Sequence, residues 1–230
     1  MSMFTEITLA CPACGTEMPF KAVRSVNADR RSDLRAAILD ESFQRTPCGA
    51  CGIVFRLDPD FAYINADRGQ WIAARPLARL ADWKQQEAEA RDAFDRVYGS
   101  GAPPGVQAIG RRVVPRITFG WAGLREKLVI QAHGLDDVAV ELAKAAVLRA
   151  SGELPIAGSE LRLAGLDGDD RSLVFACLNS ADEAAVSMKR LPRAIYDAVV
   201  ADADGGWREL RERLDVGLFV DLGKLMLADR

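Results

Sequence analysis

Histidine is almost absent from this sequence, which holds a single one, His133, among 230 residues. Open catalytic zinc sites usually draw on histidine, so such a site would have to recruit acidic side chains here. The phosphate-binding glycine loop, the G-x-S-x-G elbow and the H-E-x-x-H helix motif are also missing. The sequence therefore predicts no catalytic residue. An enzyme whose carboxylates are scattered along the chain stays open as an alternative.

Long apolar runs are missing as well. No stretch reaches the roughly 18 apolar residues that a membrane-spanning helix requires. Residues 1–6 lack a basic segment followed by an apolar one, so we expect no export signal. A chain that is not exported keeps its thiols in a reducing compartment. We therefore expect a cytoplasmic protein without membrane contact.

Positive charge is not in excess. Lysine and arginine number 30 against 33 aspartate and glutamate residues, for a formal net charge of −3. Residues 77–150 carry a net charge of only +2, and residues 151–230 carry −5. Nucleic-acid affinity depends mainly on neutralising phosphates, so nucleic acid is not an expected partner. A nucleic-acid-associated regulator remains an alternative, and its one basic cluster would be Arg111, Arg112 and Arg116.

Two C-x-x-C-G motifs, at residues 11–15 and 48–52, are the clearest chemical signal in the chain. They supply four thiols, from Cys11, Cys14, Cys48 and Cys51. The two residues between each pair allow both sulfurs to face one ion, and the glycine that follows tolerates positive φ where the chain turns away. Four thiolates close the coordination shell of a structural zinc ion, leaving no position for water or substrate. We predict such a site.

Other chemistries of these cysteines remain open. Iron in a rubredoxin-like centre uses the same four thiolates, although zinc is the preferred assignment. A redox pair would need one motif at the start of a helix that follows a strand, and structural disulfides would suit an exported chain. The fifth cysteine, Cys177, lies in an apolar run over residues 173–178, where we expect a small buried strand residue.

The pattern of residues predicts an α+β fold in three regions. A zinc-ribbon domain over residues 1–76 contains an inserted helix over residues 32–39. Its strands are expected over residues 4–10, 20–26, 53–57, 61–65 and 71–75, with a turn at 66–69. A helical region follows over residues 77–150, with helices at 77–98, 121–132 and 136–149 and a Gly/Pro linker near 99–105.

The third region, residues 151–230, is predicted to be an acidic α+β region. Residues 160–166 and 172–178 flank a turn at Asp167–Asp170 and should form a β-hairpin. A further strand near residues 186–188 and helices over 192–201 and 207–214 complete the expected elements.

The surroundings of the cysteines resemble the CpXC domain family, a bacterial group named for paired cysteine motifs. The similarity is carried by residues 7–15, 25–29 and 48–55, and further along by 123–128 and 134–137; it is densest over residues 4–150. Gly49 stands where the family usually has proline. The resemblance implies a zinc-ribbon domain with a helical partner, and it implies no activity.

These observations favour a non-enzymatic module that recognises a protein partner or associates with itself. Exposed aromatic side chains would serve such a role. The candidates are Trp71, Trp83, Trp121 and Trp207. The alternative is an enzyme or regulator whose site forms between regions.

Overall fold

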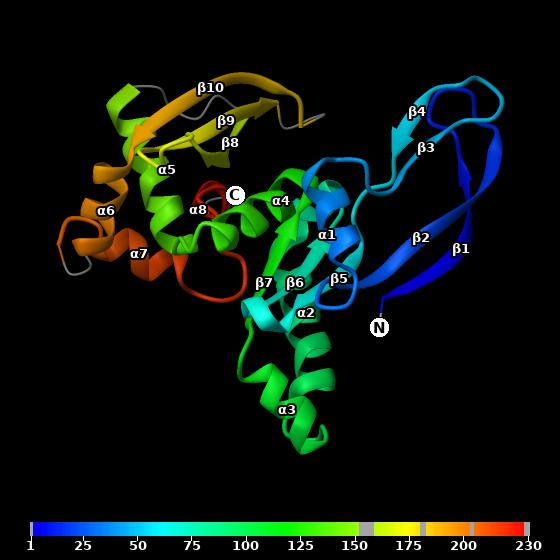
Figure 1. Cartoon of the computed structure of the whole chain (residues 1–230), viewed down its shortest axis with the longest axis horizontal. Helices are drawn as coiled ribbons and strands as arrows, with labels where there is room; N and C mark the ends of the chain where they lie inside the picture. Colours follow the sequence, from blue (N-terminus) through cyan, green and yellow to red (C-terminus); the bar gives the residue numbers. More distant parts are fainter. Residues whose placement is uncertain (1, 152–158, 180–182, 203–204, 228–230) are drawn as a thin grey trace. The chain divides into compact units, whose positions relative to one another are not determined.

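A computed structural model describes residues 2–151, 159–179, 183–202 and 205–227 of the chain. Contacts divide the protein into two compact units, Met1–Trp121 and Ala122–Arg230, which are described separately (Figure 1). The described part holds eight α-helices and three sheets, which confirms the α+β class. The three regions with boundaries at residues 76 and 150 stay a prediction. Among the described helices, none combines the length and the hydrophobicity that crossing a lipid bilayer requires.

Unit 1 is built on a five-stranded mixed sheet in the order β1-β2-β5-β6-β7. The strands are β1 (Met3–Ala10), β2 (Glu17–Asn27), β5 (Phe61–Asn65), β6 (Gln70–Arg75) and β7 (Val114–Phe119). Strands β1 and β2, and likewise β5 and β6, pair antiparallel, whereas β2 with β5 and β6 with β7 run parallel. The turn expected at residues 66–69 is present as the 3₁₀ helix η1 (Ala66–Arg68) followed by Gly69 at φ 67°.

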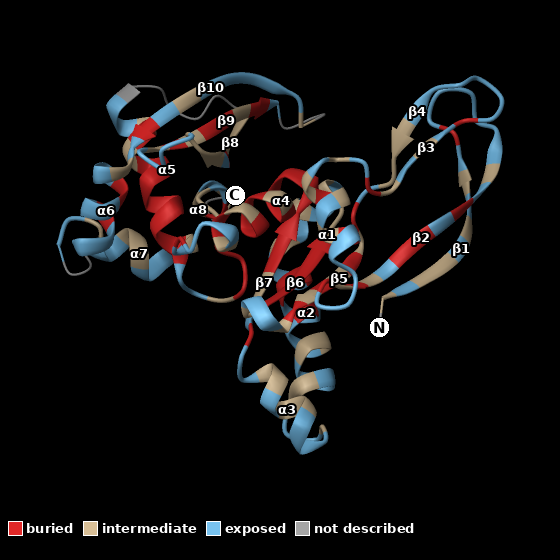
Figure 2. Ribbon diagram, viewed as in Figure 1, coloured by how far each residue is buried: buried red, intermediate tan, exposed pale blue. Residues whose placement is uncertain are grey.

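Strands β1 and β2 extend beyond the sheet as a two-stranded arm. β2 pairs with β5 only through Ser25–Asn27, but it pairs with β1 all the way to its first residue, Glu17. At about 3.3 Å per residue, the remaining eight residues of β2 reach about 26 Å from the sheet. Figure 2 shows the burial: β5 and β6 are largely buried, whereas β1 has no buried residue. The arm ends in the turn that carries the first cysteine motif.

A second, shorter hairpin lies beside this arm. It consists of β3 (Arg45–Pro47) and β4 (Val54–Arg56), paired antiparallel. The Gln44 side chain holds it to β2: its Oε1 accepts from the Val23 amide at 2.9 Å and its Nε2 donates to the Lys21 carbonyl at 3.2 Å. At the same end of the hairpin, its base, the Arg56 guanidinium lies 3.7 Å from the ring centre of Trp121. The second hairpin therefore has two attachments that involve no cysteine.

Helices and aromatic rings complete the core of unit 1. Helix α1 (Ser32–Leu39) has the bounds expected from the sequence and buries Leu34 and Ile38. The rings of Phe43, Phe61 and Trp121 meet with centroids 5.9–6.2 Å apart. Helices α2 (Trp83–Tyr98) and α3 (Pro104–Gly110) follow in sequence.

Three features of residues 77–119 differ from the expected elements. The helix expected over residues 77–98 becomes α-helical only at Trp83, because residues 77–82 form the 3₁₀ helix η2. None of these six residues is buried, so no packing favours the wider α geometry there. The Gly/Pro segment 99–105 runs from α2 into α3 inside unit 1. The unexpected strand β7 pairs with β6 from a distant part of the sequence.

Unit 2 combines an antiparallel three-stranded sheet with helices. The sheet has the order β10-β9-β8, formed by β8 (Ser159–Leu166), β9 (Ser172–Asn179) and β10 (Ala185–Pro192). The hairpin expected from the sequence is β8–β9, and the short expected strand is the longer β10. The helices are α4 (Gly120–Ala132), whose first two residues belong to unit 1, α5 (Asp137–Ser151), α6 (Arg193–Ala201), α7 (Arg208–Leu214) and α8 (Gly223–Leu227).

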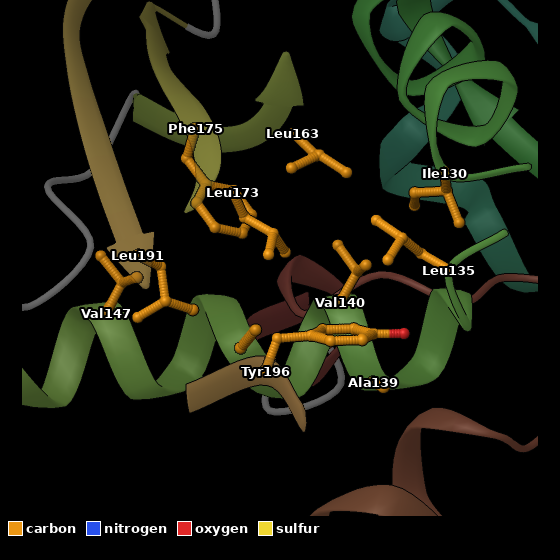
Figure 3. Packing of buried hydrophobic residues seen from close by; sticks show 11 residues of the cluster. Ile130, Leu135, Ala139, Val140, Val147, Leu163, Leu173, Phe175, Leu191 and Tyr196 are labelled. Carbon is orange, nitrogen blue, oxygen red and sulfur yellow. The ribbon is translucent and has the colours of Figure 1, made fainter. Parts of the chain in front are cut away.

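The core of unit 2 lies between α5 and one face of the sheet. Figure 3 shows Phe175 and Leu173 from β9 above α5, with Val140 and Val147 on the helix below them. The Tyr196 hydroxyl accepts a hydrogen bond from the Asp136 amide at 2.9 Å. Asp136 in turn caps α5, because its carboxylate accepts from the Ala139 amide at 2.7 Å. Gly134, at φ 61°, ends α4 as the sequence predicts.

Candidate metal centre

The two cysteine motifs adopt the same backbone arrangement at the tips of the hairpins β1–β2 and β3–β4 of unit 1 (Figure 1). In the first, the Cys11 carbonyl accepts from the Gly15 amide at 2.9 Å; in the second, the Cys48 carbonyl accepts from the Gly52 amide at 2.9 Å. Both glycines have φ 73°, a conformation that costs other residues energy. We call these turns, residues 11–15 and 48–52, the two knuckles.

The knuckles bring all four predicted cysteines together. Their Sγ atoms lie within 4.8 Å of one another. Two contacts cross between the hairpins: the Sγ atoms of Cys11 and Cys51 are 3.7 Å apart, as are those of Cys14 and Cys48. Cys11 and Cys48 are buried, whereas Cys14 and Cys51 are exposed. Each hairpin thus contributes one inner and one outer sulfur to a single cluster.

The distances fit a metal site better than a pair of disulfides. A tetrahedral ion with metal–sulfur bonds of about 2.3 Å holds its sulfurs about 3.8 Å apart. A disulfide bond measures only about 2.05 Å, and all five cysteines of the chain are free. Four sulfur donors in this arrangement suit a tetrahedral thiophilic ion, zinc or iron. Cys11, Cys14, Cys48 and Cys51 can therefore hold a metal ion.

The electrostatics of the cluster also call for a cation. The side chain and backbone of Thr16 lower the pKa of the Cys14 thiol to about 6, and backbone amides of Cys51 and Ala50 lower the pKa of Cys48. For Cys51, the Ile53 amide acts to lower the pKa, but desolvation and the neighbouring cysteines raise it to about 12. Thiolates this close oppose further ionisation of their neighbours, and a bound divalent ion removes that penalty.

Other residues singled out from the sequence take structural positions. Cys177 is half-buried in β9, and Asp167 accepts from the Arg171 and Ser172 amides in the β8–β9 turn. Among the described residues, the four cysteines are the one group of three or more His, Cys, Asp or Glu side chains placed to share an ion. Of the tryptophans considered for an interface, none is exposed: two are buried and two half-buried.

Sequence reasoning missed two features beside the cluster. Thr16 follows the first knuckle directly, and its Oγ1 lies 3.3 Å from Cys14 Sγ. The sequence did offer a signal for this contact, because a hydroxyl residue next to a cysteine motif can form a hydrogen bond with a sulfur. Ile53 and Val54, directly after the second knuckle, are 44% and 55% exposed although the sequence suggested an ordinary strand. Two exposed apolar side chains therefore directly follow the candidate metal centre in the sequence.

The family model described as CpXC protein matches residues 9–144, which is more than half of the chain and includes both knuckles. No curated protein and no solved structure matches the chain.

Proposed function

Because the chain belongs to the CpXC family, we propose that its four cysteines bind one structural zinc ion and that the two hairpins joined in this way form a docking platform for a protein partner. The observation that carries the proposal is the cluster of four sulfurs, in which two contacts of 3.7 Å run from one hairpin to the other. A metal there links two separate segments of the chain.

A structural role for the ion follows from the donor set. Four thiolates fill a tetrahedral shell, so neither water nor substrate has a coordination position. The module is accordingly proposed as non-enzymatic. A cytoplasmic location fits the proposal, because a reducing compartment keeps four thiols available for metal.

The chemistry of the tips favours a protein over a nucleic acid as the partner. Residues 11–16 and 47–54 contain no lysine or arginine. Four thiolates with one divalent ion carry a net charge of −2, which repels phosphate. Ile53 and Val54 offer exposed apolar side chains at the same tip. We therefore propose a protein partner with an apolar contact surface. This partner is either another protein or a second copy of this chain.

Metal content tests the first half of the proposal. Protein purified without added metal should contain one zinc per chain by elemental analysis, with no visible absorption from iron–thiolate bonds. Cys14→Ser and Cys51→Ser should lower the zinc content to well below one ion. Cys177→Ser is the matched control, since it removes a thiol outside the cluster, and it should keep the full zinc content. Wild-type protein without zinc or iron would contradict the proposal.

The docking role is tested by Ile53→Asp, with Val186→Asp as the control. Both residues are exposed and apolar, 44% and 73% respectively, but Val186 lies on β10 of unit 2. Proteins that co-purify with the wild type should be lost with Ile53→Asp and kept with Val186→Asp, while both variants retain zinc. If the chain associates with itself, the molar mass measured by light scattering should fall in Ile53→Asp and stay unchanged in Val186→Asp. If Ile53→Asp changes neither, the docking role is wrong.

A further inference from the structure

Unit 2 contains a buried group of charged side chains that the candidate metal centre does not involve. We call it the ionic cluster; it consists of Glu126, Glu141, Lys144, Glu160, Arg162 and Asp221. Its centre is the Lys144 ammonium, whose Nζ lies 2.8 Å from the carboxylates of both Glu126 and Glu141. These three side chains are at most 3% exposed. Arg162 contacts the remaining members, Glu160 and Asp221, as well as Glu126.

The ionic cluster holds a segment near the end of the described chain, Leu218–Lys224, which we call the C-terminal strap. Three consecutive strap residues are each bound by a charged side chain from a different element. Lys127 of α4 donates to the Val220 carbonyl at 2.8 Å, and Arg162 of β8 pairs with the Asp221 carboxylate. The Leu222 amide donates to Glu141 Oε2 on α5 at 2.8 Å.

Charge within the ionic cluster is not balanced. Within the described part of the chain, its four carboxylates form ion pairs with two cations, Lys144 and Arg162. The nearby Lys127 forms an ion pair with Asp137 at 3.1 Å, and Lys224 donates to the carbonyls of Leu214 and Val216. Burying unbalanced negative charge is costly, and a bound proton is the simplest way to reduce it.

Glu141 is the member best placed to take that proton. Its side chain is fully buried on α5 and shares Lys144 with Glu126. Desolvation, helped by Asp221 and Glu126 and opposed by Lys144 and Lys127, raises the pKa of Glu141 to about 7. Attraction to cations instead keeps the pKa values of Glu126 and Asp221 low despite their burial. A protonated Glu141 still has a carbonyl oxygen that can accept from the Leu222 amide.

We propose that the C-terminal strap is a proton-linked closure: it stays bound to α4, α5 and β8 while Glu141 is protonated, and it opens more often as Glu141 ionises. Opening admits water to Glu141 and returns its affinity for protons toward the ordinary value. Low pH favours the conformation in which Glu141 has the higher pKa, which is the closed one. The closed strap is therefore most stable at low pH, and its stability falls between pH about 4.5 and about 7. This inference concerns unit 2 and does not depend on the metal.

Hydrogen exchange of the full-length protein measures the opening directly. Exchange of the strap amides, above all Leu222, is followed by mass spectrometry at pH 6, 7 and 8 and corrected for the intrinsic pH dependence of exchange. With pKa values of about 7 closed and about 4.5 open, the opening constant should rise about tenfold from pH 6 to pH 8. Amides of α2 in unit 1 serve as the internal reference. An opening constant that stays level or falls with pH would overturn the proposal.

Glu141→Gln isolates the responsible group, because the amide cannot ionise. The pH dependence of strap opening should disappear in this variant. Glu87→Gln is the matched control, since Glu87 is a buried helix glutamate that pairs with Arg91 in unit 1; it should keep the wild-type dependence. A dependence that survives in Glu141→Gln overturns the proposal. If Glu141→Gln does not fold, carbon-13 NMR of the glutamate carboxyl groups in the wild type tests the proposal instead. One glutamate carboxyl must then titrate near pH 7, and the absence of such a signal overturns the proposal.

Discussion

Lys144→Met offers the sharpest test of how the ionic cluster contributes to stability. The ammonium is 3% exposed and lies 2.8 Å from two carboxylates that are equally buried. Methionine fills a similar volume but leaves Glu126 with only Arg162 and Glu141 with no cation at contact distance among the ion pairs described. Removing one partner of a buried ion pair costs about 3–5 kcal/mol, a large part of the roughly 5–15 kcal/mol that stabilises a domain.

Urea unfolding followed by circular dichroism measures this loss. With an m-value of about 2 kcal/mol per molar urea, a loss of 4 kcal/mol lowers the midpoint by about 2 M. At pH 8, where Glu141 of the wild type is ionised, adding Glu141→Gln to Lys144→Met should restore part of the loss, because it removes the uncompensated carboxylate. Arg91→Met is the control: its guanidinium is 53% exposed beside Glu87, so it should cost at most about 1 kcal/mol. A loss that small for Lys144→Met would refute the reasoning.

Three further predictions concern single features. Removing the metal with a chelator should abolish hydrogen-exchange protection at residues 48–54, lower it less at residues 11–17, where the paired strands also hold the knuckle, and leave the amides of α5 unchanged, because metal binding stabilises only the segments that the metal links. Gly52→Ala should lower stability by about 1–2 kcal/mol in thermal unfolding, since φ is 73° there, whereas Gly49→Ala in the same knuckle meets no atom within 4 Å and should have little effect. Asp136→Ala should cost about 1 kcal/mol in urea unfolding through the lost α5 cap, and Asp167→Ala, in a surface turn, is its comparison.

The features predicted correctly from the sequence are those fixed by neighbouring residues. Helix α1 begins and ends at the expected residues, and the hairpin β8–β9 forms around its Asp/Gly turn. The cysteine spacing predicted which four sulfurs meet because each pair is positioned by its own turn of five residues. In each case the determining interactions lie within a few positions along the chain, where residue patterns carry the information.

The features that were missed depend on distant partners. Strand β7 contains Pro115, which argues against a strand, yet β7 lies at the edge of the sheet and pairs with β6 across about 40 residues. The ionic cluster joins Glu126 to Arg162 and Asp221. Nothing in the local pattern of Glu126 tells it from a surface glutamate on a helix. Its burial becomes visible only when β8 and the C-terminal strap are in place.

The two knuckles differ in what the metal adds to them. The first ends an arm whose strands are paired along their length, so its backbone needs no ion. The second ends a hairpin of three paired residues per strand, too short to be stable by itself. Its other attachments, Gln44 on β2 and Arg56 on Trp121, act at the base rather than the tip. The ion should therefore order chiefly the second knuckle and the exposed Ile53 and Val54 beside it. A partner that binds these residues should accordingly bind the metal-loaded protein more tightly than the metal-free protein.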